Sequence, residues 1–294
     1  MTDATPLRRH RSRYGVWTRV PVTPQHALEI EKLGYGALWV GGSQHAQLRF
    51  AEPILEKTTD LMVATGIVNI WSAPAKTIAQ SFHLIDTAYP DRFLLGVGVG
   101  HRERTAEYRT PYDVLVDYLD ELDAAGVPSH RRVIGALGPR MLNLAARRSA
   151  GAHPFLTTPE HTRRARALLG DDAYLAPEQA VVLSTETDEA RAVGRNMIAK
   201  FLGLVNHVNN WKRLGFSDAD LAKPGSDRLV DALVAHGSAD DVANRLNEHM
   251  EAGADHVAIR VLGGQDKLLP SLAALSDHLN MDIPRSTAVA TWVR

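Results

Sequence analysis

The sequence predicts an α/β protein built as one (β/α)₈ barrel, also called a TIM barrel, with a helical insertion near its carboxyl-terminal third. Short apolar, β-branched runs alternate with helical patterns eight times along the 294 residues, which is typical of parallel βα units. Barrels of this kind commonly use such a length for a single domain. A hydrophobic content of 45% with 23% charged residues is enough to bury a large core.

The first five strand–helix units are the most regular. Residues 14–18 form the first expected strand, and the helix after it begins near Thr23, with Pro24 in the first turn, where a missing N–H does no harm. Gly151 is expected to end the fifth helix as a C-cap. The other expected strands and helices of these units are Ala37–Val40 with Pro53–Thr59, Leu61–Val68 with Ala75–Ala88, Phe93–Val97 with Pro111–Ala125, and Arg132–Ala136 with Arg140–Ser149.

Three less regular units follow. Ala152–Phe155 is a weak strand before a helix at Pro159–Leu169, and Gln179–Thr185 precedes a long helical stretch from Asp188. The helix Ser238–Ala252, the strand His256–Leu262 and the helix Leu268–Leu279 complete the pattern.

Three segments lie outside the repeating units. Residues 206–236 are too long for a plain βα connection and are expected to form a helical insertion over the barrel, either as a lid or as a packing or subunit-contact element. Residues 1–13 and 282–294 are expected to be flexible tails, so the domain covers residues 14–281.

Composition excludes several classes of function. A formal net charge of -1 offers no general attraction for nucleic acid, and no cysteine is present for a disulfide, a thiolate metal site or a nucleophile. The sequence shows no signal peptide and no membrane span, so a cytoplasmic protein acting on a small molecule is expected. The thirteen histidines include no His-x-His in the first strand and no H-E-x-x-H, so no metal site is expected.

Candidate functional residues are those that follow each strand, because the active sites of such barrels lie at the carboxyl ends of the strands. Trp17 and Trp71 are candidates for the walls of a pocket for a planar ligand, and His45 and His101 are candidate proton donors or acceptors. Each of the four has a purely structural alternative. Carboxylates are nearly absent at the expected strand ends, with Glu103 and Asp266 nearest, which disfavours a paired-carboxylate hydrolase.

Two glycine-containing segments follow strands. The run from Gly96 to Gly100 has the spacing G-x-G-x-G, which is not the Rossmann fingerprint, so its glycines serve either strand crowding or close approach of a ligand. Gly138-Pro139-Arg140 begins a helix directly after a strand, which suits a phosphate, although an ordinary Gly-Pro turn explains it as well.

Several motifs taken together resemble a known family. They are ATGIVNI at 64–70, PAKTIAQ at 74–80, YPDRFLLGVGVG at 89–100, GALGPRMLNLAA at 135–146, LAPEQAVVL at 175–183 and NNWKRLGF at 209–216. In this order and spacing they resemble the luciferase-like monooxygenase superfamily, in particular its branch of oxidoreductases that depend on the deazaflavin coenzyme F420. The resemblance covers almost the whole chain.

The resemblance implies a cofactor site and a reaction. It implies a non-prolyl cis peptide and a bulge at Gly66–Ile67 behind the deazaflavin ring, with Asn69 at the ring edge. Gly98 and Gly100 would allow the ring to approach closely, and the helix start at Gly138, Pro139 and Arg140 would hold the phosphate. Hydride would then pass between the ring and a small organic substrate, in a homodimer.

One departure from the family concerns the proton donor. Relatives often carry an acidic residue and a histidine after the second strand, where this chain has Gly41-Gly42-Ser43-Gln44-His45. Gly42 and Ser43 therefore fall in the cofactor-binding set, and His45 replaces the usual histidine only if the loop is displaced. Two alternatives stay open: an FMN-dependent luciferase-like monooxygenase, and a flavin- or deazaflavin-binding protein without catalysis.

Overall fold

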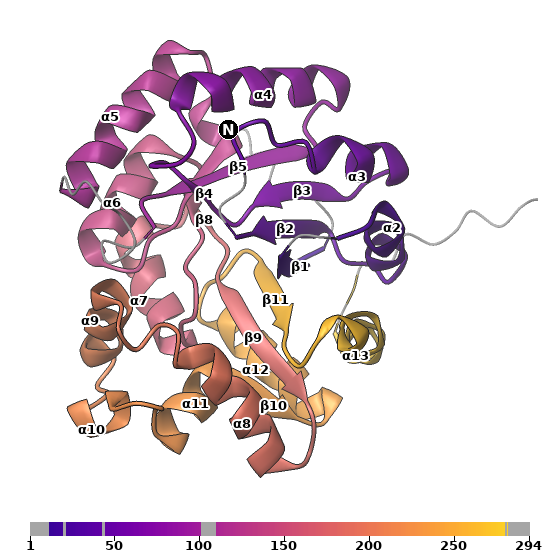
Figure 1. The fold of residues 1–294 in the computed structure, drawn as a ribbon, viewed down its shortest axis with the longest axis vertical. Coiled ribbons are helices and arrows are strands. Elements are labelled where there is room, and N and C mark those ends of the chain that lie inside the picture. The colour runs from indigo at the N-terminus through magenta and orange to yellow at the C-terminus, as the bar shows by residue number, and fades with distance from the viewer. Residues whose placement is uncertain (1–11, 20–21, 43–44, 101–109, 280, 282–294) are drawn as a thin grey trace, which may run out of the picture.

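The protein is described by a computed structural model, which covers residues 12–19, 22–42, 45–100, 110–279 and 281. Parallel strands form a curled sheet at the centre of the molecule, with helices around it (Figure 1). The strands are β1 (Tyr14–Arg19), β2 (Ala37–Gly41), β3 (Met62–Thr65), β4 (Val68–Asn69), β5 (Phe93–Gly98), β6 (Arg132–Ile134), β7 (Gly151–Ala152), β8 (Tyr174–Leu175), β9 (Glu178–Leu183), β10 (Val234–Gly237) and β11 (Val257–Val261). The helices are α2 (Pro24–Lys32), α3 (Ala51–Lys57), α4 (Ala75–Ala88), α5 (Pro111–Ala124), η2 (Ser129–Arg131), α6 (Pro139–Arg148), α7 (Pro159–Leu169), α8 (Thr187–Ile198), α9 (Val205–Arg213), α10 (Asp218–Leu221), α11 (Asp227–Leu233), α12 (Ala239–Glu251), η3 (Gln265–Lys267) and α13 (Leu268–Ser276).

The order of the strands confirms the predicted barrel. Hydrogen-bonded neighbours run β9-β11-β1-β2-β3-β5-β6-β7-β8, all parallel. β8 and β9 are successive parts of one extended segment, and the Glu178 N–H donates to the Pro154 carbonyl after β7 at 2.8 Å. Because this segment pairs with β7 on one side and with β11 on the other, the sheet closes into a ring in the manner of a (β/α)₈ barrel.

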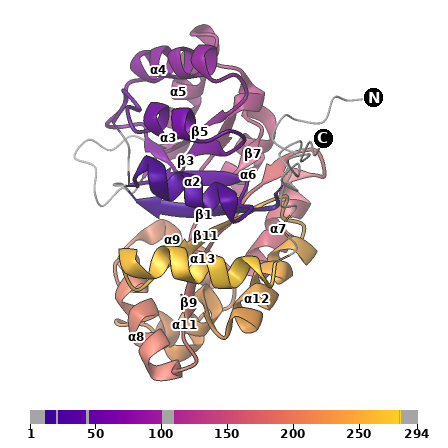
Figure 2. The same cartoon turned by 90° about the vertical axis from the view of Figure 1, so that its right-hand side faces the viewer.

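The interior and the outside of the ring hold different side chains. Trp17, Trp39, Tyr174 and small residues such as Ala258 form a buried cluster inside the ring, while a larger apolar cluster lies between the sheet and the helices. α13 lies beside α2 on the outside (Figure 2), and the Tyr35 hydroxyl donates to the Leu272 carbonyl at 2.8 Å to join these two parts of the chain.

The structure corrects two details of the sequence prediction. The expected third strand, Leu61–Val68, is two strands, β3 and β4, separated by a bulge. Gly151 does not cap a helix: α6 ends with Ser149 as its C-cap, and Gly151 is the first residue of β7. A Cβ at Gly151 would lie 1.8 Å from the Tyr174 carbonyl oxygen, so the close approach of β7 to β8 explains this glycine.

The expected insertion at 206–236 is helical for most of its length, as α9, α10 and α11, but it ends in a strand that the sequence analysis missed. β10 continues directly from α11 and pairs with β9 outside the ring, with Val234 opposite Ala180. Trp211 of α9 is completely buried, and its indole N–H donates to the Leu156 carbonyl at 3.3 Å. The insertion is therefore packed against the carboxyl-terminal side of β7.

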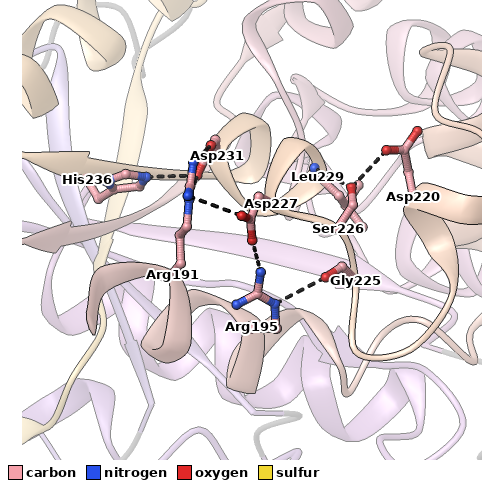
Figure 3. Close-up of polar contacts among 9 residues, drawn as sticks. All are labelled: Arg191, Arg195, Asp220, Gly225, Ser226, Asp227, Leu229, Asp231 and His236. Atoms are coloured by element: carbon pink, nitrogen blue, oxygen red, sulfur yellow. Dashed lines mark hydrogen bonds and ion pairs between the residues drawn. The ribbon is translucent and has the colours of Figure 1, made fainter. Parts of the chain in front are cut away.

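A polar network joins the insertion to α8 (Figure 3). The Arg191 guanidinium donates to both carboxylate oxygens of Asp231 at 2.9 and 2.7 Å, and the same carboxylate faces His236 Nε2 at 3.0 Å. Arg195 donates to the Gly225 carbonyl at 3.1 Å and pairs with Asp227. These contacts favour the packing role over a freely moving lid.

Candidate functional site

A bulge separates β3 from β4 near the carboxyl end of the barrel. Val63 pairs with Phe93 and Val68 pairs with Val97, so five steps along one strand match four along the other. The peptide bond between Gly66 and Ile67, within this bulge, is cis, as the family resemblance implied.

At the bulge, the hydroxyl of Thr65 provides hydrogen bonds between β3 and β5. It donates to the Gly96 carbonyl at 2.8 Å and accepts from the Gly96 N–H at 2.7 Å. A Cβ at Gly96 would lie 2.0 Å from the Thr65 carbonyl oxygen. The glycine at 96 therefore follows from strand crowding, the structural explanation considered from the sequence.

Trp17 lies inside the ring next to the bulge. Its indole N–H donates to the Gly66 carbonyl at 3.1 Å, and its side chain is buried. A Cβ at Gly41 would lie 2.0 Å from Trp17 Cζ2, so only glycine at 41 leaves room for the indole there. Trp17 thus fixes the position of Gly66.

Three predicted cofactor-binding residues lie next to Ile67 or to each other. A Cβ at Gly98 would lie 3.0 Å from Ile67 Cδ1, and Gly100, at a φ of 60°, would bring a Cβ to 2.9 Å from Asn69 Nδ2. The Asn69 side-chain oxygen accepts from the Trp71 N–H at 3.2 Å. Ile67, Asn69, Gly98 and Gly100 therefore form one contiguous group at the end of β3, β4 and β5.

Trp71 is predicted to form a wall of the pocket, and His45 is predicted to donate or accept a proton. The Trp71 indole N–H donates to the Val99 carbonyl at 2.9 Å, which attaches the half-buried ring to the segment after β5. His45 is exposed and borders a cavity of about 470 Å³ together with Gln47, Leu48, Arg49 and Phe50.

The loop after β2 is described only in part. Gly42 is exposed with a φ of 98°, a backbone conformation that favours glycine. Ser43 and His101, the remaining predicted site residues of these loops, lie outside the described residues.

The amino terminus of α6 has the features of an anion site. Gly138 is its N-cap with no side chain capping the first turn, Pro139 follows, and Arg140 stacks on the Tyr112 ring with its guanidinium carbon 4.0 Å from the ring centre. Arg213, at the end of α9, reaches this helix start, since a Cβ at Gly138 would lie 3.6 Å from Arg213 Nη2. An uncapped helix start with a guanidinium beside it fits a phosphate.

Arg213 was missed by the sequence analysis because it lies in the insertion, far along the chain from Gly138. Gly138 itself has φ −90° and ψ 157°, which any residue can adopt. The helix start therefore needs no glycine for its backbone conformation.

Glu178 is a buried and Arg260 a largely buried charged residue, and neither was predicted as a site residue. Both point into the ring: Arg260 alternates with Ala258 on β11, and Glu178 lies two residues after Ala176. Arg260 stacks on Trp17, with its guanidinium carbon 4.6 Å from the ring centre, and Glu178 is completely buried. Burial raises the pKa of the Glu178 carboxyl to about 7 and lowers that of Arg260.

The reason for missing Glu178 is the start of its strand. The sequence pattern predicts a seventh strand from Gln179, whereas the extended segment begins at Tyr174, with β8. Glu178 then falls in the middle of a barrel strand. A carboxylate inside the quoted LAPEQAVVL motif was the available signal.

His153 is a further buried polar side chain near the bulge. Its Nδ1 lies 2.7 Å from the Ala176 carbonyl oxygen and must therefore carry the proton, whereas its Nε2 lies 3.1 Å from the place of a Cβ on Gly66. Complete burial lowers the pKa of His153 to about 4, so the ring is neutral at pH 7.

Comparison with known proteins is consistent with this arrangement. Residues 7–126 match the family model of the luciferase-like monooxygenases. This part of the chain therefore resembles that family. No curated protein matches it in sequence.

Solved structures extend this result to the fold of nearly the whole chain. An F420-dependent secondary alcohol dehydrogenase superposes with a TM-score of 0.72 at 12% identity, covering 93% of this chain and 99% of the other. The F420-dependent tetrahydromethanopterin reductase from Methanopyrus kandleri gives 0.66 at 13%, covering 92% and 98%. The FMN-bound oxygenating constituent of 3,6-diketocamphane monooxygenase from Pseudomonas putida gives 0.65 at 13%, covering 92% and 97%. At these identities the similarity establishes a luciferase-like barrel fold for this protein.

The described residues contain neither a metal-binding cluster nor a membrane-spanning helix. No group of three or more histidine, cysteine, aspartate or glutamate side chains is arranged to hold a metal ion there. No helix in the described part of the chain is long and apolar enough to cross a membrane.

Proposed function

We propose that this luciferase-like protein is an oxidoreductase that moves a hydride between coenzyme F420 and a small organic substrate. The observation that carries the proposal is the position of the β3–β4 bulge and the uncapped α6 start, which both follow strands at the carboxyl end of the same barrel. The ordered motifs of the F420 branch in this sequence support the deazaflavin, and F420-dependent enzymes occur among the proteins of similar fold.

The residues present fit such a cofactor. In this proposal the bulge at Gly66 and Ile67 supports one face of the ring, with Asn69 at its edge. The α6 start and the Arg213 guanidinium bind the phosphate. The bound deazaflavin supplies hydride chemistry, while Trp17, held by the Gly66 carbonyl, keeps the bulge in place and helps to exclude water.

A titration tests the choice of cofactor. Purified protein is titrated in parallel with F420 and with FMN, and binding is followed by the fluorescence of each cofactor. We expect F420 to bind at least about tenfold more tightly, a difference of about 1.4 kcal/mol. No binding of F420 would eliminate the proposal.

A second titration tests the phosphate site. Arg213→Ala is compared with Lys212→Ala, a neighbour on α9 whose amine pairs with Asp218 instead. Removing a charged hydrogen-bond donor weakens phosphate binding by about tenfold or more. We therefore expect Arg213→Ala to weaken FMN binding but not riboflavin binding, since riboflavin lacks the phosphate, and Lys212→Ala to change neither. Equal loss for both flavins would place Arg213 away from the phosphate.

The second candidate function is an FMN-dependent monooxygenase. The FMN-bound diketocamphane enzyme of similar fold and the name of the matching family model favour it. Tighter binding of FMN than of F420, together with substrate turnover that requires dioxygen, would select this function. A homodimer and a cytoplasmic location stay predictions.

A further inference from the structure

Glu178 and Arg260 form an incomplete buried ion pair inside the barrel. They lie on neighbouring strands, β9 and β11, with Arg260 opposite Ala180 in the register. Arg260 Nη1 is 3.9 Å from Glu178 Oε1, too far for a hydrogen bond. Both atoms are buried, and neither has a hydrogen-bond partner among the described residues.

This arrangement calls for an explanation, because buried charged groups normally have their hydrogen bonds satisfied. Arg260 stacks on two rings that help to hold it, with the centres of Trp17 and Phe155 at 4.6 Å and 5.5 Å from the guanidinium carbon. Glu178 is held from its other side, since its Oε2 accepts from the Leu156 N–H at 2.9 Å. The gap between the two charged groups is therefore fixed by packing.

A single oxygen atom can bridge this gap. If an oxygen lay about 2.8 Å from each of the two atoms, the angle at the oxygen between Arg260 Nη1 and Glu178 Oε1 would be about 90°. One hydroxyl group accommodates this angle. The hydroxyl would accept from Arg260 Nη1 and donate to Glu178 Oε1, so that each atom gains the partner it lacks. A carbonyl oxygen would instead accept from both groups when the carboxyl carries a proton.

The pair is close to the bulge that the proposed function assigns to the cofactor. One indole separates them, since Trp17 donates to the Gly66 carbonyl at 3.1 Å while its ring face carries Arg260. An oxygen held between Glu178 and Arg260 would therefore lie beside the proposed ring site.

We propose that Glu178 and Arg260 bind the oxygen of the substrate, and that the substrate is a small alcohol or the carbonyl compound formed from it. The proposal rests on the hydride-transfer function proposed above. When the alcohol is oxidised, its C–H bond breaks and both electrons leave as hydride to the oxidised cofactor. The O–H bond breaks, its proton passes to Glu178 Oε1, and a C=O bond forms. The reverse reaction returns this proton.

The electrostatics of the pair suit both directions of this proton transfer. Since burial raises the pKa of Glu178 to about 7, the carboxyl can be either charged or protonated near neutral pH. The Arg260 guanidinium stays charged and keeps its hydrogen bond to the oxygen in both states.

Direct binding tests the proposal. Cyclohexanol and cyclohexanone serve as probes, and their binding to the protein, with and without F420, is measured by saturation-transfer NMR. The variants are Glu178→Gln and Arg260→Lys, and the control is Arg228→Lys, in which an arginine that stacks on Phe216 with its guanidinium carbon 4.7 Å from the ring centre is changed in the same way. Loss of a hydrogen bond to a charged group predicts about tenfold weaker binding of cyclohexanol in each of the first two variants. The control should match the wild type, and F420 affinity should stay within about twofold in all.

Infrared spectroscopy gives a second measurement that does not depend on turnover. With ¹³C-labelled glutamate, cyclohexanol should shift a carboxyl band of the wild type, and this difference should be absent in Glu178→Gln, even if Arg260→Lys folds poorly. Wild-type affinity for cyclohexanol in both variants, as expected if only a water molecule bridges the pair, would overturn the proposal. So would F420 binding without binding of either probe. Failure of F420 to bind would instead remove the proposed function, because binding of the probes is measured separately.

Discussion

The stability of the protein in mild acid should reveal the protonation state of Glu178. Three buried groups with large pKa shifts contribute to this dependence. Burial lowers the pKa of His153 to about 4 and that of His249 to about 3, whereas it raises the pKa of Glu178 to about 7. His249 lies between Thr162 and Gln179, with ring nitrogens 2.8 Å from a polar atom of each, and is completely buried.

The two residue types act in opposite directions. Below the ordinary histidine pKa of about 6.5, the unfolded chain binds protons that the buried histidines do not, so each histidine lowers the free energy of unfolding by about 1.4 kcal/mol per pH unit. Glu178 binds its proton in the folded state first. Between about pH 7 and the ordinary value near 4.5, acidification therefore raises the free energy of unfolding by the same amount.

Glu178 should thus cancel one of the two histidines. From pH 6.5 to pH 5, each group contributes roughly 2 kcal/mol. His153, His249 and Glu178 together should cost the wild type about 2 kcal/mol, and Glu178→Gln should lose about 4 kcal/mol over the same interval. His161, whose pKa burial also lowers, adds to the loss in both proteins and leaves their difference unchanged.

Guanidinium chloride unfolding, followed by tryptophan fluorescence at pH 6.5 and pH 5, measures these changes. Glu56→Gln on α3 removes an exposed carboxylate and is the control that should behave as the wild type. Equal losses in the wild type and in Glu178→Gln would refute the raised pKa of Glu178. They would also remove the support that this pKa gives to proton transfer by that group.

Two further predictions concern packing. Gly96→Ala should lower the free energy of unfolding by about 2 kcal/mol or more, because its Cβ would lie 2.0 Å from the Thr65 carbonyl oxygen, whereas Gly203→Ala, with nothing within 4 Å, should change it little; equal melting temperatures for the two variants would contradict the crowding. Arg191→Ala should lower the melting temperature only slightly, since its partly exposed pairing with Asp231 is screened by solvent, but it should speed proteolysis within residues 205–233. Unchanged proteolysis would show that this pair does not hold the insertion in place.

Much of the candidate cofactor site could be predicted from the sequence because its residues follow strands closely. Gly66, Ile67, Asn69, Gly98 and Gly100 all lie within a few residues of a predicted strand end, and the structure brings them together. Their binding of a cofactor stays a proposal. Strand and side-chain crowding accounts for Gly96 and Gly41 without a ligand.

The charged groups could not be predicted in the same way. Arg213 reaches the α6 start from an insertion whose path over the barrel no local pattern reports. Glu178 and Arg260 meet because β9 and β11 are neighbours, although β10 lies between them in the chain. Their burial and their 3.9 Å separation depend on packing against Trp17, Phe155 and Leu156.

The sequence by itself determined the alternation of strands and helices, and hence the parallel barrel, because hydrophobic periodicity and turn residues are local properties of the chain. It also predicted a cofactor site at the end of the third strand, through the order of its motifs. Only the tertiary structure decided which charged side chains face the interior at that end. Closing the ring places residues distant in the chain side by side, and the burial that results sets the charge of Glu178 and the gap beside Arg260.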